Sequence, residues 1–229
     1  AASGLVAKKF AQYGLLPIAV YIFTWAGWFI SDRGWDRQWS TNPFVSWLHY
    51  HQEMLNFHTG LTEKHPYQAN PWSWLVMGRP TSFFYATPKD CGAKDCAQEV
   101  LAMGTPVLWW SAAISLVILV ALWLKNKQWS TGFILLAVSA GYLPWFVFPQ
   151  RTTFTFYAII FEPWLIMAFV AVLRNYYLTS FGNPKLKLYS IIFIMCLIAA
   201  NFIYHFPIFV GQITTYDDWH SLMWFKKWI

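Results

Sequence analysis

Five long apolar stretches constrain this chain more than any other feature of its sequence. They cover residues 14–30, 105–124, 131–148, 154–173 and 188–213. Each approaches or reaches the length of about 20 residues with which a helix crosses roughly 30 Å of hydrocarbon. Only 11% of the 229 residues are charged, which is too few to cover a water-soluble globule. The sequence therefore predicts an all-α integral membrane fold with about five transmembrane helices.

The basic residues predict how these helices are oriented. One set of connectors carries seven basic and no acidic residues, namely Lys8, Lys9, Lys125, Lys127, Arg174, Lys185 and Lys187. Such connectors face the cytoplasm. We therefore expect a first transmembrane helix with a cytoplasmic start (1–31), a large outer loop (32–104), four transmembrane helices (105–213) and an outer interfacial tail (214–229). The net charge of +6 comes from clusters at span ends, so no nucleic-acid surface is expected.

The outer loop is expected to open with an amphipathic helix on the membrane surface. Asn42-Pro43 is a helix-start signal, and a helix over 44–58 places Trp47, His51 and His58 on one face with Met54 and Leu55. After Gly60 the prolines predict irregular structure. Further along, Cys91 and Cys96 lie five residues apart, and the spacing leaves a small disulfide and two free thiols as alternatives.

A polar, aromatic segment of this loop is the main candidate site. The run HPYQANPWSW (65–74) combines an imidazole, a phenol, amides and indoles, a mixture that suits a sugar. The candidates for sugar or acceptor binding are His58, His65, Tyr67, Asn70 and Trp72. An interfacial aromatic belt is the alternative. The spacing of the loop's four histidines favours hydrogen bonding over metal binding, so no metal site is expected.

Two isolated arginines near outer span boundaries are candidates for binding a lipid phosphate. Arg79 follows the polar segment, and Arg151 precedes hydroxyls at Thr152, Thr153 and Thr155. A guanidinium group binds phosphate through two parallel hydrogen bonds. Snorkelling to headgroups is the alternative for both, and it is favoured for Arg79.

Three polar residues are expected inside the apolar stretches. Glu162 falls near the middle of the fourth stretch, before Pro163, and Asn201 and His205 lie four apart in the fifth. Such residues face other helices or a wet cavity, although a protonated Glu162 could also simply be packed. Asn201 and His205 are candidates for interhelical hydrogen bonds to Glu162 or to parts of the protein outside this chain. A transporter would use them as a polar pathway, and a non-catalytic scaffold subunit is a further alternative.

Several runs in order carry a specific resemblance. They are HQEMLNFHTGL, HPYQANPWSWLVMGRP, GTPVLWW, GYLPWF, RTTFTFYAIIFEP and WHSLMWFKKWI. Together they resemble the carboxyl-terminal part of protein O-mannosyltransferases, multi-span glycosyltransferases of the GT-C class. The bacterial, actinobacterial-type members look most similar, because the loop 32–104 is too short for the extra domains of eukaryotic relatives. The resemblance covers nearly the whole chain.

The resemblance implies inverting transfer of mannose from polyprenyl-phosphate mannose to Ser or Thr hydroxyls of exported polypeptides, with no cofactor beyond this donor. It implies a bacterial plasma membrane, a carboxyl terminus outside, and the bilayer and secretion translocon as partners. The family's general base is an acidic pair near the amino terminus of the full enzyme, which no acidic residue here matches. We therefore expect no catalytic residue in this chain and no activity from it alone. By similarity, the HPYQANPW segment, Arg79 and Arg151 would shape the acceptor and phosphate side of the active site.

Overall fold

The computed structural model describes residues 2–229 and divides the chain into two compact units, with the division between Leu61 and Thr62. This division lies inside the outer loop expected at 32–104. Ala1, part of the expected first segment, lies outside the described residues. Each unit has its own internal packing, and the polar segment and both candidate arginines belong to the second.

The first unit is a helical run followed by one further helix. The run contains α1 (Ala2–Phe10), a π-helical turn (Ala11–Leu15), α2 (Leu16–Thr24) and α3 (Ala26–Ile30). Helix α4 (Pro43–Gly60) begins where the sequence predicts, because the Asn42 side chain accepts a hydrogen bond from the Phe44 amide at 3.0 Å. On α4, His51 lies 2.6 Å from the Tyr21 hydroxyl and packs against Trp47. His51 is therefore part of an aromatic cluster within this unit.

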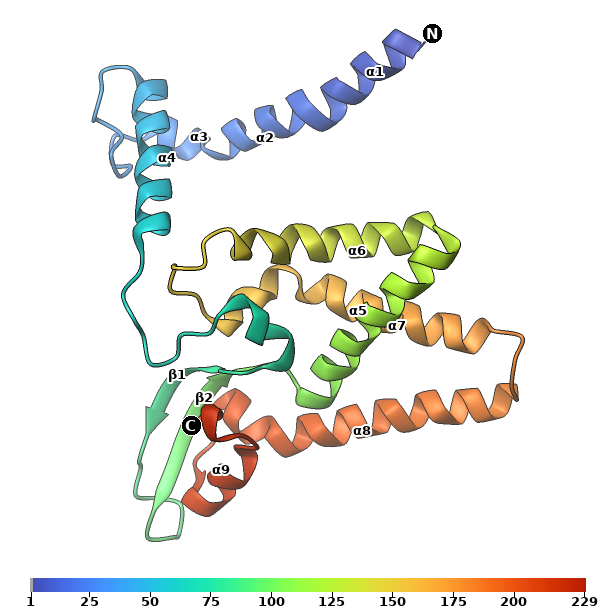
Figure 1. Cartoon of the computed structure of the whole chain (residues 1–229). Helices are drawn as coiled ribbons and strands as arrows, with labels where there is room; N and C mark the ends of the chain where they lie inside the picture. Colours follow the sequence, from blue (N-terminus) through green and yellow to red (C-terminus); the bar gives the residue numbers. More distant parts are fainter. Residues whose placement is uncertain (1) are drawn as a thin grey trace. The chain divides into compact units, whose positions relative to one another are not determined.

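Four antiparallel helices form the frame of the second unit (Figure 1). They are α5 (Pro106–Asn126), α6 (Trp129–Tyr142), α7 (Glu162–Leu178) and α8 (Pro184–Val210). A 3-10 turn (Leu143–Phe146) extends α6. The chain reverses after each helix, so the α5–α6 and α7–α8 connectors lie at one end of the frame, and the α6–α7 connector and the sheet lie at the other.

Two of the described helices, α5 and α8, are long and apolar enough to cross a membrane. Their most apolar windows are only 22% and 17% buried. The exposed side chains include large apolar ones, for example Val117 at 71% and Ile203 at 70% exposure. Such surfaces are stable when hydrocarbon covers them.

The fourth apolar stretch differs from its predicted form. Residues Thr155–Ile160 form a 3-10 helix, and Glu162 is the first residue of α7. Pro163 therefore stands in the first helical turn, where its missing amide and fixed φ cost little. The prediction that Glu162 lies near the middle of a continuous span was wrong.

A small antiparallel sheet means that the chain is mostly, and not wholly, helical. Strands β1 (Thr81–Ala86), β2 (Cys96–Ala102) and β3 (Thr214–Thr215) pair in the order β1-β2-β3. Tyr85 pairs with Glu99, and Ala97 with Thr214. The all-α prediction missed this sheet, which joins the outer loop to the segment after α8.

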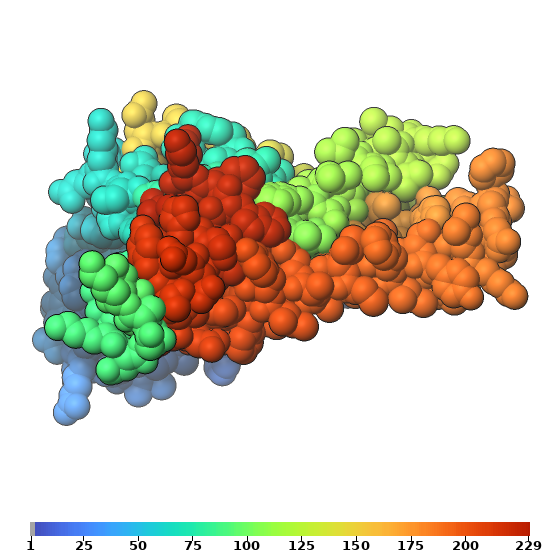
Figure 2. All heavy atoms as spheres, turned by 90° about the horizontal axis from the view of Figure 1, so that it is seen from below, coloured from blue at the N-terminus to red at the C-terminus, as the bar shows by residue number. Residues whose placement is uncertain are grey.

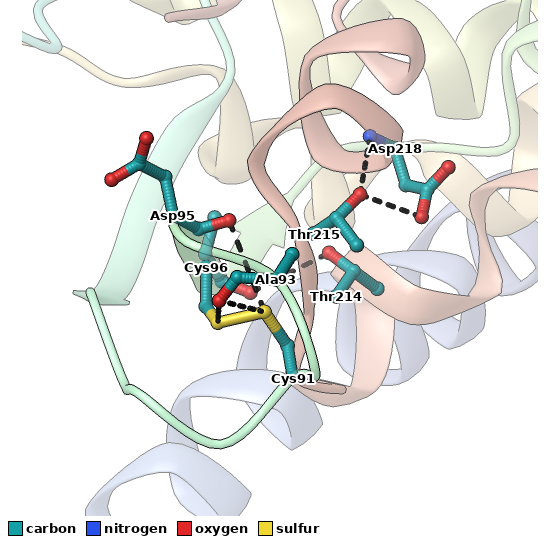
Figure 3. Close-up of a disulfide and its surroundings, with 8 residues drawn as sticks. Cys91, Ala93, Asp95, Cys96, Thr214, Thr215 and Asp218 are labelled. Atoms are coloured by element: carbon teal, nitrogen blue, oxygen red, sulfur yellow. Dashed lines mark hydrogen bonds between the residues drawn. A yellow bond between two sulfur atoms is a disulfide. The ribbon is translucent and has the colours of Figure 1, made fainter.

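A disulfide between Cys91 and Cys96 closes the β1–β2 connection (Figure 3). Beside it, Thr215 starts α9 (Tyr216–Leu222) by accepting a hydrogen bond from the Asp218 amide at 3.1 Å. Of the two alternatives that the spacing left open, the structure has the disulfide. The bond lies in the connection between β1 and β2.

Buried indoles fix the polar segment against the helices. Trp74 donates to the Ala69 carbonyl at 2.9 Å, and Trp109 of α5 donates to the Trp74 carbonyl at 3.0 Å. Trp228, in a 3-10 turn (Lys226–Trp228), donates to the Met77 carbonyl at 2.8 Å. All three rings are 5% exposed or less. The segment around the 3-10 helix Pro71–Val76 is therefore built into the core of the second unit.

Candidate functional site

Three threonine hydroxyls that follow Arg151 bond to the polar segment and to the residues on either side of it. Thr153 donates to the Ala69 carbonyl at 2.8 Å and Thr155 to the Arg79 carbonyl at 2.6 Å, while Thr152 donates to the Glu63 carbonyl. The Ala69 amide donates back to the Thr153 carbonyl at 2.8 Å.

These threonines are at most 4% exposed. The sequence suggested that they add hydroxyl donors to a phosphate site. The structure directs their protons to backbone carbonyls, so that part of the hypothesis was wrong.

Arg79 joins the polar segment to the carboxyl-terminal tail. Its Nε donates to the Pro66 carbonyl at 3.2 Å, and its Nη1 lies 2.5 Å from the carbonyl oxygens of Lys227 and Ile229. The guanidinium also lies over the Tyr67 ring, at 4.8 Å from the ring centre. Several of its donors are therefore engaged by the protein itself.

A polar hollow of about 620 Å³ opens between the polar segment and the tail. Its lining includes Gln68, Asn70, Trp72, Ser73, Arg79 and Lys227. Trp72 is 61% exposed, and the Ser73 hydroxyl donates to the Asn70 carbonyl at 2.8 Å. The amides, hydroxyl and indole offer both donors and acceptors beside an aromatic face, which are the groups that a hexose requires. The structure thus brings Asn70, Trp72 and Arg79 together around one hollow.

His65 and Tyr67 lie beside this hollow but do not line it. The His65 Nδ1 accepts a hydrogen bond from the Tyr67 amide at 3.2 Å, and the two rings lie 6.0 Å apart. His65 is exposed and its ring also meets Phe154 at 5.1 Å. His58 lies in the last turn of α4 in the first unit, so it is not placed relative to the hollow.

Arg151 lies in an aromatic setting. Its guanidinium carbon is 5.2 Å from the centre of the Trp145 ring and 5.6 Å from that of Tyr157. Both rings pack on the buried Trp74. Arg151 is not among the residues that line the polar hollow. The structure therefore does not bring the two candidate arginines into one site.

The polar residues of α8 bond within the frame. The Asn201 Oδ1 accepts a hydrogen bond from the Val107 amide at 3.0 Å and so satisfies a donor in the first turn of α5. The Asn201 amide nitrogen lies 3.3 Å from the His205 Nδ1. The predicted shared face is confirmed, since the two side chains meet on α8. The interhelical role is confirmed for Asn201 alone, and its partner is the backbone of α5 and not Glu162.

Within residues 2–229, no three His, Cys, Asp or Glu side chains gather closely enough to hold a metal ion.

The contribution of Lys227 to the polar hollow was not predicted from the sequence. The tail sequence WFKKWI mixes aromatic and basic residues, and that signal indicated an interfacial position only.

A family model describing the C-terminal four-transmembrane region of protein O-mannosyltransferases matches residues 43–228. The chain therefore belongs to the protein O-mannosyltransferase family and corresponds to its carboxyl-terminal membrane region.

Similar curated proteins are named polyprenol-phosphate-mannose–protein mannosyltransferases. The relative from Mycolicibacterium smegmatis is 31% identical over 94% of this chain, and that from Corynebacterium glutamicum is 30% identical over 93%. The Mycobacterium tuberculosis relative is 29% identical over 94%. The match covers 45–46% of each relative, so the chain spans about half of their length.

A solved structure has a similar fold. It is the Saccharomyces cerevisiae protein O-mannosyltransferase Pmt1-Pmt2 complex bound to the sugar donor, which matches with a TM-score of 0.69 at 19% identity. The match covers 83% of this chain and 28% of that one. It establishes the fold of the frame.

Proposed function

We propose that this chain is the carboxyl-terminal part of a polyprenyl-phosphate-mannose–protein mannosyltransferase. The observation that carries the proposal is the similarity to bacterial relatives of that name along 93–94% of the chain. The whole enzyme transfers mannose to Ser or Thr hydroxyls of exported polypeptides. The expected contact with the secretion translocon has no structural support and is not part of the proposal.

The reaction is an inverting displacement. The acceptor oxygen forms a bond to the anomeric carbon of mannose as the bond from that carbon to the phosphate oxygen breaks. A carboxylate outside this chain takes the hydroxyl proton, and the lipid phosphate leaves with the bonding electron pair. The task of the present residues is therefore to bind the donor and acceptor and to hold them in position.

The polar hollow is the proposed sugar subsite. Asn70 and Trp72 offer an amide and an exposed indole face to mannose, with His65 and Tyr67 beside them toward the acceptor. Arg79 is a positioning residue, because its hydrogen bonds to the carbonyls of Pro66, Lys227 and Ile229 hold the two sides of the hollow together. The stacking of Arg151 on Trp145 supports a similar positioning role in place of direct phosphate contact.

The proposed topology is five membrane crossings in a bacterial plasma membrane, with the carboxyl terminus outside. The antiparallel order of α5 to α8 supports it, because it places the basic connectors at one end of the frame and the sheet, polar hollow and tail at the other. In this arrangement α4 lies on the outer surface. A transporter is the less supported alternative, since Asn201 and His205 bond to each other and Asn201 also bonds to α5.

The test is mannose transfer by the full-length enzyme in membranes, from polyprenyl-phosphate mannose to a Thr-rich peptide. Asn70→Ala should lower kcat/KM by about three- to tenfold, the loss expected for one hydrogen bond to a sugar hydroxyl. Gln128→Ala, at the opposite end of the frame, is the matched control and should transfer normally. Normal kcat/KM in a well-expressed Asn70→Ala enzyme would remove the polar hollow from the active site.

A further inference from the structure

A second, apolar hollow of about 640 Å³ adjoins the polar hollow. Its walls include Trp110 of α5, Val76 at the end of the 3-10 helix that follows Asn70, and Phe225 and Trp228 of the tail. The two hollows share Val76, Gly78 and Lys227 in their linings, so they meet along one seam. Figure 2 shows the tail (red) lying against the segment that follows residue 62 (teal).

The seam between the hollows is positively charged. Lys227 lines both hollows, Arg79 lines the polar one and Lys226 the apolar one. Among the described residues that line either hollow there is no Asp or Glu. A ligand that fits both hollows therefore has a polar group at one end, an anionic group at the seam and an apolar chain at the other end.

We infer that this pair of hollows binds the lipid donor across the seam, with mannose in the polar hollow, the phosphate at the Lys227 ammonium group and the first isoprene units in the apolar hollow. This inference rests on the proposed function and adds to it a phosphate-binding residue and a chain subsite in the tail. A membrane phospholipid matches less well, because it has no sugar to fill the amide- and indole-lined hollow.

The architecture of the tail suits this task. The backbone of Lys227 is held by Arg79 through its carbonyl, while the Lys227 side chain is exposed. Trp228 is 1% exposed and anchors the same turn through its bond to Met77. Because the backbone of Lys227 is already fixed, binding a phosphate has to order only its side chain, which favours binding.

The test uses a polyprenyl phosphate with a photoreactive group in its first isoprene units and the full-length enzyme in lipid nanodiscs. Labelling should fall on peptides that contain residues 224–228, and unmodified polyprenyl phosphate should compete for it. Excess phosphatidylglycerol should not compete. Labelling elsewhere, or equal competition by phosphatidylglycerol, would overturn the inference and leave only a general lipid contact.

Matched variants sharpen this test. Lys227→Gln should lower labelling and raise the KM for the donor by about tenfold, because one charge-assisted hydrogen bond to the phosphate is lost. The kcat should change little. Lys227→Arg should restore both values, and Lys125→Gln, at the far end of α5, should leave them unchanged. Wild-type labelling by Lys227→Gln would overturn the inference.

The two proposals fail in different ways. A wild-type enzyme that labels at the tail but transfers no mannose would overturn the proposed function and keep the lipid-phosphate site. An enzyme that transfers normally but labels elsewhere would overturn only the present inference.

Discussion

Replacing Thr153 by Val tests how the polar segment is held in place. The substitution keeps the shape of the side chain and removes the hydroxyl that donates to the Ala69 carbonyl at 2.8 Å. Trp74 still donates to that carbonyl at 2.9 Å, so no buried acceptor is left without a partner. The expected cost is therefore that of one net hydrogen bond, about 1 kcal/mol, without the larger penalty of an orphaned group.

The cost should appear as easier local opening of the segment. The Ala69 amide donates to the Thr153 carbonyl at 2.8 Å, which makes it the reporter for this contact. A change of about 1 kcal/mol corresponds to roughly fivefold faster hydrogen exchange where exchange proceeds by local opening. The measurement is hydrogen–deuterium exchange by mass spectrometry on the peptide covering 63–79, in the full-length protein.

Thr153→Ser is the matched control, because it keeps the hydroxyl. In this variant the peptide 63–79 should exchange hydrogen much more slowly than in Thr153→Val. The reasoning is refuted if Thr153→Val exchanges like the wild type, or if both substitutions accelerate exchange equally. In the second case the hydroxyl would contribute no more than the methyl group that Ser lacks, so the hydrogen bond would have no special role.

Three further predictions concern the frame, the hairpin and the topology. Asn201→Leu removes the side-chain oxygen that accepts a hydrogen bond from the Val107 amide at the start of α5. Because that amide is left unpaired, the free energy of unfolding should fall by about 1–3 kcal/mol. An unchanged melting temperature in detergent would contradict this. Replacing Cys91 and Cys96 together by Ser should cost about 2 kcal/mol by the chain-entropy relation for a short loop. It should speed exchange in the hairpin 81–102 while mannose transfer continues, and loss of transfer at normal expression would show that the hairpin takes part in the site. In a variant that lacks the free Cys196, Gln128→Cys should react with a membrane-impermeant thiol reagent only after the cells are opened. Gln150→Cys should react in intact cells. The reverse pattern would invert the proposed topology.

Much of the frame was predictable because its signals are local. Helices α5 and α8 follow from runs of apolar residues, and the start of α4 follows from Asn42 and Pro43. The polar segment was also recognisable, since it combines amides, an imidazole and indoles within ten residues. These features depend on neighbours in the chain, which a sequence displays directly.

The remaining features depend on contacts between distant residues. Arg79 finds its partners in a tail 148 and 150 residues away, and Thr153 finds its acceptor 84 residues away. Both residue types also bind phosphate, so the sequence alone did not separate a structural role from a ligand role. Strand β2 pairs with β3, which follows the last long helix, and no local pattern indicates that partner.

The most direct test of the central claim is to express the full-length protein in a strain that lacks its own protein mannosyltransferase. Its membranes are then supplied with polyprenyl-phosphate mannose and a Thr-rich peptide, with the M. smegmatis relative as the positive control. We expect mass spectrometry to find a single O-linked mannose on the peptide, dependent on the donor. The claim is contradicted if the relative mannosylates the peptide while the well-expressed, membrane-inserted protein does not.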